Sequence, residues 1–204
     1  DEIAEAEAVV HRLRTMEAAN PELSWGDMAV LYRTNAQSRS IEESLVRWGI
    51  PYIVVGGLRF YDRREIKDLL AYLRLLVNPA DTVSLLRVIN VPKRGIGKTT
   101  IQRLTDAANQ LGIPLWDVVS DAEAVRSLGG RSARGLLQFC ELLHDLRRQV
   151  QEVAPSELIQ QVMEKSGYVS ELIAEGTDEA EERRRNLQEL VNAALQYQEE
   201  NEEG

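Results

Sequence analysis

The stretch Val91–Thr100, VPKRGIGKTT, separates two predicted helices in the middle of this 204-residue chain, and we call it the glycine hairpin. Pro92 ends the helix before it, because proline lacks the N–H group that a helix interior requires. Gly95 and Gly97 permit a tight turn with positive φ and close approach of a backbone. A second helix begins near Thr99, with its first N–H groups facing outward. The stretch therefore predicts a turn between two helices.

Basic side chains gather at the glycine hairpin. Between Arg87 and Arg103 the sequence holds five cations and no acid. A helix N-terminus attracts phosphate through its N–H groups and its dipole, and Lys93, Arg94 and Lys98 add positive charge. The combination predicts binding of a duplex backbone in helix–hairpin–helix geometry, through phosphate contacts that carry no base information. A plain corner between helices, capped by glycine, is the alternative.

A similar but weaker pattern occurs at Leu128–Ala133, LGGRSA, which we call the second turn. Gly129 and Gly130 permit a tight turn before another predicted helix, and Arg131 supplies one cation. The second turn is a secondary candidate for phosphate contact. A simple helix corner is the more economical interpretation of this stretch.

The charge of the chain is segregated along its length. The net charge is −9, which by itself argues against a nucleic-acid partner. Residues 59–103 nevertheless sum to +6, whereas residues 104–174 and 175–204 sum to −4 and −7. We therefore expect a polyanion to bind at the basic block, and the acidic C-terminal segment to form a solvated helix.

Composition and missing motifs exclude several classes of protein. The single cysteine, Cys140, excludes a disulfide framework, and with only His11 and His144 beside it a four-ligand zinc site is excluded as well. No apolar run approaches the ~20 residues that span a bilayer, and the N-terminus lacks a signal region, so we expect a cytoplasmic protein with no membrane partner. A complete phosphate-binding loop, a nucleophile elbow and a zinc-protease motif are all missing, so no catalytic or metal-binding residue is predicted.

Two short apolar runs indicate a small α/β unit near the N-terminus. Met28–Tyr32 is predicted to be a buried strand and Tyr52–Val55 a second strand, with a helix over Ala36–Trp48 between them. Two strands do not form a stable sheet alone, so we expect an incomplete βαβ piece and a chain that is a fragment. Its exposed sheet edges predict either poor order or a homodimer.

Apolar residues at helical spacing dominate the rest of the chain, and Pro and Gly separate the segments. The predicted fold class is therefore mainly α with a small α/β part. The predicted helices outside the α/β unit cover residues 2–17, 64–77, 83–89, 99–111, 115–119, 133–151, 155–166 and 177–200.

Another group of candidate site residues follows the two predicted strands. Ligands of open α/β sheets bind beyond the carboxyl ends of strands, where Tyr32–Asn35 and Arg59 are expected. Asn35 and Arg59 are thus placed to meet a phosphate backbone together. Each residue also has a structural alternative: Asn35 as a helix cap, and Arg59 as an ion-pair partner of Asp62 or Glu65.

Three stretches resemble consecutive motifs of the UvrD/PcrA-type superfamily 1A DNA helicases. They read VLYRTNAQSR at Val30–Arg39, GGLRFYDRREIKD at Gly56–Asp68 and NVPKRGIG at Asn90–Gly97. The resemblance extends over essentially the whole chain. It implies a RecA-like motor subdomain, 2A, interrupted by a helical accessory subdomain, 2B. Residues 1–60 would then be part of 2A, and residues 61–204 most of 2B.

The resemblance also implies a function and site residues. The parent enzyme would unwind duplex DNA from 3′ to 5′ in repair or replication in the bacterial cytosol and nucleoid, using ATP and Mg²⁺. The fragment would bind neither ATP nor Mg²⁺ and would lack ATPase activity, because the family's nucleotide-binding motifs are missing from it. It would bind DNA and regulate the parent. The implied single-strand contacts are Tyr32, Arg33, Thr34, Asn35 and Arg59; the implied duplex contacts are Lys93, Arg94, Gly95, Ile96, Gly97, Lys98 and Thr100, with Gly129, Gly130 and Arg131 as weaker candidates.

Two other functions compete with this interpretation. In the first, the helical surface is a regulatory module that docks repair or replication proteins, and DNA contact is incidental. In the second, an adaptor unrelated to motors uses the same kind of hairpin. A duplex affinity that falls steeply with added salt would favour DNA binding over both.

Overall fold

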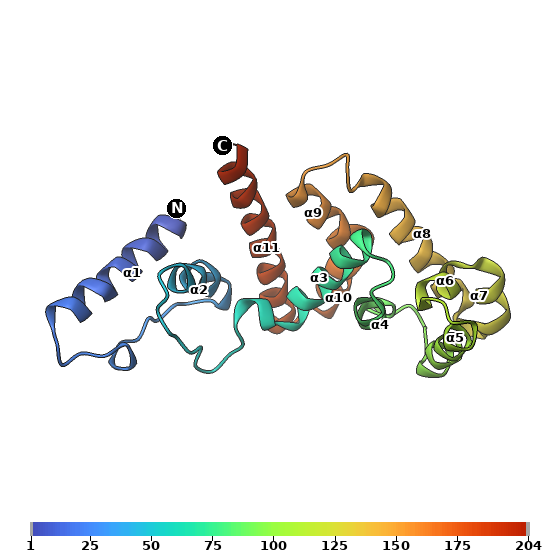
Figure 1. The fold of residues 1–204 in the computed structure, drawn as a ribbon, viewed down its shortest axis with the longest axis horizontal. Coiled ribbons are helices and arrows are strands. Elements are labelled where there is room, and N and C mark those ends of the chain that lie inside the picture. Colours follow the sequence, from blue (N-terminus) through green and yellow to red (C-terminus); the bar gives the residue numbers. More distant parts are fainter. Residues whose placement is uncertain (1, 203–204) are drawn as a thin grey trace. The chain divides into compact units, whose positions relative to one another are not determined.

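The computed structural model describes residues 2–202, which form helices joined by turns and loops (Figure 1). The predicted domains, residues 1–60 and 61–204, include residue 1 and residues 203–204, which lie outside the described residues. Four short 3-10 helices accompany the α-helices: η1 Trp25–Asp27, η2 Asn35–Gln37, η3 Phe60–Asp62 and η4 Gly130–Ser132. The α-helices are α1 Glu2–Ala19, α2 Ser38–Arg47, α3 Arg64–Val77, α4 Thr82–Val88, α5 Lys98–Leu111, α6 Leu115–Ser120, α7 Ala122–Leu128, α8 Ala133–Gln149, α9 Pro155–Lys165, α10 Tyr168–Glu175 and α11 Asp178–Glu202.

The predicted α/β unit is wrong. The structure is 74% helix, and residues 2–202 contain no strand. Both predicted strands are irregular segments, because a strand needs a neighbouring strand for its backbone hydrogen bonds and the described chain offers none. Leu31, Ile53 and Val55 consequently remain 94%, 83% and 84% exposed. The homodimer predicted through sheet edges is wrong for the same reason, since the described residues form no sheet.

Helices are predicted more accurately than strands, because helix hydrogen bonds are local. The prediction over residues 64–77 is confirmed by α3 at the same bounds. Two short helices, α7 and α10, were not predicted. The Asp121 carboxylate caps α7 by accepting from the Glu123 and Ala124 amides at 2.7 and 2.9 Å, a signal that the sequence contained.

The chain divides into two compact units, a first unit that ends at Ile66 and a second unit that begins at Lys67. In the first unit α1 and α2 pack side by side (Figure 1). Their contact buries Val10, Leu45 and Ile50, and Leu13 and Trp25 pack against this small core. The loops that flank α2 carry the candidate single-strand contacts.

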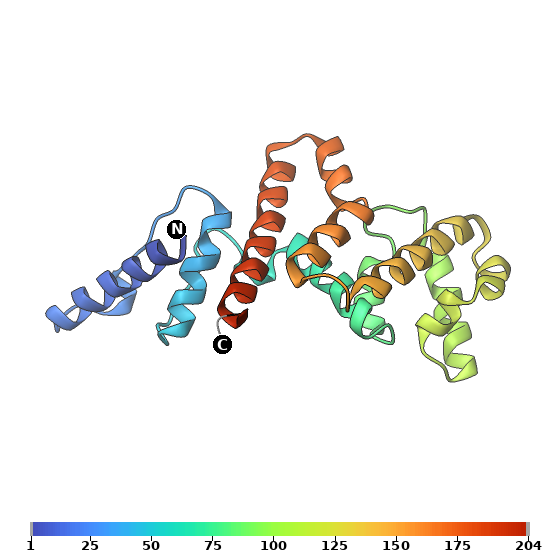
Figure 2. The same cartoon turned by 90° about the horizontal axis from the view of Figure 1, so that it is seen from above.

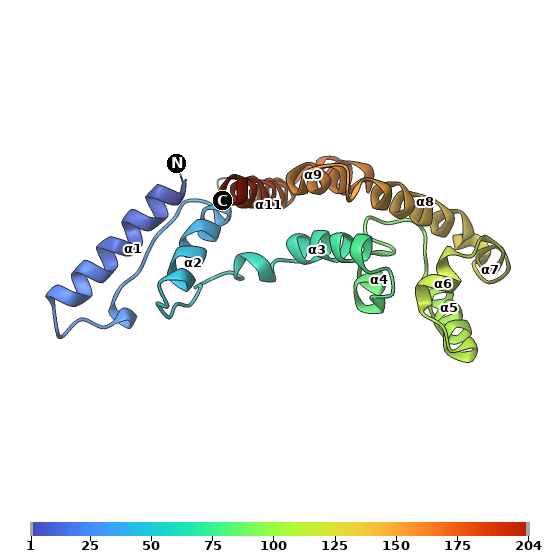
Figure 3. The ribbon, with the colours of Figure 1, turned by 45° about the horizontal axis from the view of Figure 1, so that its top comes forward.

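In its described part the second unit consists of helices joined by turns and loops. Helices α9, α10 and α11 pack against one another (Figure 2), and α5, α6 and α7 gather at one end of the unit (Figure 3). Helix α8 contacts α6, α7 and α9 and so joins the two groups. The largest fully buried side chains of this unit are Tyr72, Phe139, Leu69, Leu75, Leu85, Ile89, Leu104, Leu136, Leu143 and Leu146.

Within residues 2–202, the helices are all too short or too polar to pass through a membrane.

The single thiol gives a first prediction. Cys140 is buried on α8, its Sγ donates to the Val119 carbonyl oxygen at 2.9 Å, and burial raises its pKa from 9.0 to about 12. Thiolate is the reactive form, so a shift of this size predicts alkylation of the folded chain on the order of a thousandfold slower than of the unfolded chain. Iodoacetamide labelling near pH 8, with and without denaturant, measures the ratio. Equal rates would show that the second unit opens readily around α8.

Candidate nucleic-acid interface

The glycine hairpin forms a tight turn held by one amide side chain. The Asn90 Oδ1 atom accepts from the Arg94 and Ile96 amides at 2.8 and 3.2 Å. Gly95 adopts φ +70°, a conformation that favours glycine, and Gly97 is the N-cap of α5. Ile96 between them is only 3% exposed and anchors the turn in the core. The helix predicted to begin near Thr99 begins at Lys98.

The N-terminus of α5 faces the turn without a side-chain cap. The N-cap residue Gly97 has no side chain, and no other described side chain caps this end of the helix. The first intrahelical bonds run from the Thr100 and Ile101 amides to the Gly97 carbonyl oxygen, both at 3.1 Å. The amides of Lys98 and Thr99 come before Thr100 in the chain and donate none of these first intrahelical bonds. They lie at the positive end of the helix dipole. This end of α5 can therefore accept an anion.

The three cations of the hairpin have different surroundings. Lys93 and Lys98 are exposed, whereas Arg94 is half-buried. The Arg94 guanidinium donates to the carbonyl oxygens of Val88 and Pro92 at 3.3 and 3.1 Å. It also donates to the Tyr72 hydroxyl at 2.7 Å and to the Ser166 carbonyl oxygen at 3.1 Å, and lies 5.2 Å from the Phe139 ring centre. These contacts turn the Arg94 side chain into the protein.

Besides the half-buried Arg94, the predicted duplex contacts divide into two groups. Lys93, Gly95, Gly97 and Lys98 are exposed, and Ile96 and Thr100 are buried. The Thr100 hydroxyl donates to the Ser132 hydroxyl at 3.3 Å instead of facing outward. Among the predicted contacts, Lys93, Lys98 and the glycine backbone are the parts that a ligand can reach.

The second turn lies directly against the glycine hairpin. Gly130 adopts φ +52° and α8 begins at Ala133, so this stretch also forms a glycine turn before a helix. The hydroxyl of Ser132 donates to the Gly95 carbonyl oxygen at 2.8 Å and accepts from the Gly97 amide at 3.4 Å. Arg131 is exposed. The structure therefore brings both glycine turns into one surface.

Sequence reasoning missed Ser132 and Gly135, which support the hairpin from α8. A Cβ atom at Gly135 would lie 2.2 Å from the Arg94 carbonyl oxygen, so only glycine lets α8 come this close. The available signal was the isolated glycine inside a helical pattern, which often marks close packing.

The candidate single-strand contacts are adjacent in the first unit. The Asn35 Oδ1 atom lies 4.0 Å from the point where a Cβ of Gly57 would be, so the loop before α2 meets the loop that carries Arg59. Asn35 and Arg59 are both exposed, and the Arg59 guanidinium lies 5.1 Å from the Tyr52 ring centre. The Gln37 side chain accepts from the amides of Arg33 and Thr34 at 3.0 and 3.1 Å.

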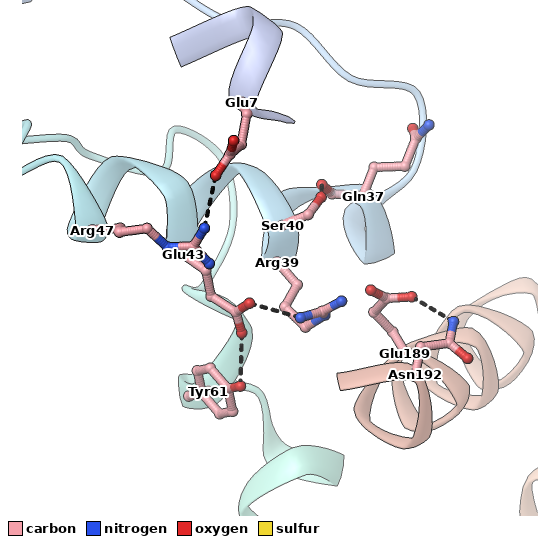
Figure 4. Close-up of polar contacts among 9 residues, drawn as sticks. All are labelled: Glu7, Gln37, Arg39, Ser40, Glu43, Arg47, Tyr61, Glu189 and Asn192. Carbon is pink, nitrogen blue, oxygen red and sulfur yellow. Dashed lines mark hydrogen bonds and ion pairs between the residues drawn. The ribbon is translucent and has the colours of Figure 1, made fainter. Parts of the chain in front are cut away.

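Two neighbouring glutamates of α2 organise the loop that carries Arg59. Buried Glu42 accepts from the Tyr52 hydroxyl at 3.1 Å and from the Phe60 amide at 3.2 Å. Glu43 accepts from Arg39 at 2.7 Å and from the Tyr61 hydroxyl at 2.9 Å (Figure 4). Burial, followed by the Glu42 charge, raises the pKa of Tyr52. Residues 59–62 are thereby tied to α2.

Side chains suited to a metal ion do not come together in the described part of the chain. No group of three or more His, Cys, Asp or Glu residues there could hold one.

Comparison with known proteins gives a consistent result. Residues 1–204 match the family described as the UvrD-like helicase C-terminal domain. The ATP-dependent DNA helicase PcrA of Leuconostoc citreum is 41% identical over 175 residues, which are 86% of this chain and 23% of that protein. PcrA of Staphylococcus aureus strain Mu50 is 39% identical over 195 residues, which are 96% of this chain and 26% of that protein. The chain spans about a quarter of the length of these relatives.

Proposed function

Because the chain belongs to the UvrD-like helicase C-terminal domain family, we propose that it is part of an ATP-dependent DNA helicase and supplies DNA contacts to that enzyme. The relatives named above are ATP-dependent DNA helicases, so the parent would couple ATP hydrolysis to DNA unwinding. By the family resemblance, unwinding would run 3′ to 5′ in the cytosol, in repair or replication. The sequence contains no complete phosphate-binding loop, and we expect the chain alone to hydrolyse no ATP.

The single observation that supports duplex binding is the exposed, uncapped start of α5 beside Lys93 and Lys98. Backbone N–H groups and the helix dipole would meet a phosphate there, and the two ammonium groups would release counterions from the duplex. Ile96 is buried between two glycines, an arrangement that supports the proposed helix–hairpin–helix element. The contact would position the duplex without reading its sequence.

The first unit would contact the single strand. Asn35 offers an amide and Arg59 a guanidinium on two adjacent loops, and Tyr32, Arg33 and Thr34 precede Asn35 in the same segment. In this assignment residues 1–60 correspond to part of subdomain 2A and residues 61–204 to most of subdomain 2B. The exposed Arg131 and the exposed Gly130 backbone of the second turn would add a weaker duplex contact, whereas Gly129 is buried.

Charge reversal at the hairpin tests the proposal. Lys98→Glu replaces an attraction to phosphate by a repulsion, so the affinity for a duplex with a single-stranded tail should fall about tenfold or more near 50 mM salt. The slope of log K against log salt concentration should become shallower by about 1. Fluorescence anisotropy of a labelled oligonucleotide measures both quantities.

Lys165→Glu is the matched control, because Lys165 is an exposed lysine of the second unit whose ammonium bonds to Gln149 and Gln161 instead of lying at the hairpin. We expect it to change the affinity much less than Lys98→Glu does. If the chain binds no duplex at low salt, or if both variants weaken binding equally, the proposed function of the hairpin is wrong.

A further inference from the structure

A single hydroxyl group joins the two glycine turns of the second unit. Ser132 is 6% exposed and lies at the end of the second turn, one residue before α8. Its Oγ atom donates to the Gly95 carbonyl oxygen at 2.8 Å and accepts from the Gly97 amide at 3.4 Å and from the Thr100 hydroxyl at 3.3 Å. A serine hydroxyl has one donor and two acceptor positions, so these three bonds use all of them.

The three partners of Ser132 bracket the part of the hairpin proposed to meet phosphate. Gly95 and Gly97 lie on either side of Ile96, and Thr100 is in the first turn of α5. Glycine restricts its own backbone least of all residues, so the shape of this turn must come from bonds to other groups. Asn90 supplies such bonds on the side of Arg94 and Ile96, and Ser132 supplies them on the side of α5.

Helix α8 packs tightly against the glycine hairpin. The Gly135 backbone lies so close to Arg94 that a Cβ atom would be 3.3 Å from the Arg94 carbonyl carbon and closer still to its oxygen. Ser132 therefore reaches the hairpin from a firmly placed helix end. Groups held in the binding geometry before the ligand arrives lose less entropy on binding.

We infer that Ser132 is a positioning residue, which holds the amides at the start of α5 in the conformation that receives duplex phosphate. The inference rests on the proposed duplex function of the hairpin. Ser132 itself contacts no DNA in this scheme. It acts through the Gly95 carbonyl and the Gly97 amide.

Removal of the hydroxyl tests the inference. Ser132→Ala should weaken duplex binding about fivefold with the salt slope nearly unchanged, because the phosphate contacts remain but are no longer preformed. Ser132→Thr retains the oxygen and should bind within about twofold of the unchanged chain. Ser120→Ala is the matched control, since its hydroxyl bonds only locally, to the Asp117 carbonyl oxygen at 3.4 Å.

Amide hydrogen exchange supplies a readout that a purely stabilising role would not change. The Gly97 amide should exchange slowly in the unchanged chain and faster in Ser132→Ala, while the amides of α9 and α11 keep their protection. If the Gly97 amide exchanged rapidly in the unchanged chain, that result alone would overturn the inference. The same conclusion would follow if folded Ser132→Ala bound duplex like Ser120→Ala. Failure of Lys98→Glu to weaken binding would instead count against the proposed function.

Discussion

Gly135→Ala is expected to destabilise the second unit by about 3 kcal/mol and to weaken duplex binding at the same time. Alanine in a helix interior normally stabilises it relative to glycine, by about 0.5–1 kcal/mol. At position 135 alanine should instead lower the stability, because its Cβ would lie 2.2 Å from the Arg94 carbonyl oxygen and 3.4 Å from the Arg94 Cβ. The closest neighbour is a backbone atom and cannot rotate away. Helix α8 would therefore have to separate from the glycine hairpin.

Urea unfolding followed by circular dichroism measures the stability change. Gly97→Ala is the matched control in the same unit, since no atom lies within 4 Å of its Cβ position and its φ is negative. The control should cost no more than about 1 kcal/mol, as expected for alanine at an N-cap. A Gly135→Ala chain as stable as the unchanged one would mean that α8 does not press on the hairpin as described.

Arg94→Ala is expected to destabilise the second unit by about 3 kcal/mol, whereas its neighbour Lys93→Ala should change stability by less than about 0.5 kcal/mol. The Arg94 guanidinium satisfies the carbonyl oxygens of Val88, Pro92 and Ser166, which alanine would leave without this donor. The Tyr72 hydroxyl would lose it as well, although that group also donates to the Val91 carbonyl oxygen. The substitution also leaves a cavity beside the Phe139 ring.

The same pair of variants separates structure from binding. Lys93→Ala should lower duplex affinity and make the salt slope shallower without moving the urea midpoint, because its side chain is exposed. Arg94→Lys keeps the charge but not the planar fork of donors, and should recover only part of the lost stability. Urea midpoints measure the stability of these variants, and anisotropy titrations measure their duplex affinity. An Arg94→Ala chain of full stability and reduced affinity would place Arg94 on the DNA instead.

The region around α2 shows where sequence reasoning failed. Met28–Tyr32 and Tyr52–Val55 have the apolar, β-branched composition of strands, yet both are irregular segments. A strand is completed by bonds to another segment, so its formation depends on a partner that composition does not reveal. The burial of Glu42 could not be predicted either. Ser38 donates to it locally within α2, but its other two donors, the Tyr52 hydroxyl and the Phe60 amide, lie beyond the helix and are brought to it only by the fold.

The sequence by itself determined most of the helices, the two glycine turns, the basic block around the hairpin and the family. Helix hydrogen bonds connect residues four apart, and the effects of glycine and proline act at their own positions, so short patterns carry this information. Only the tertiary structure decided which hairpin cations face outward. Lys93, Arg94 and Lys98 look equivalent in the sequence, but Arg94 turns inward because Tyr72, Phe139 and Ser166 pack beside it. Side-chain direction depends on neighbours that the fold brings together, and no local pattern records them.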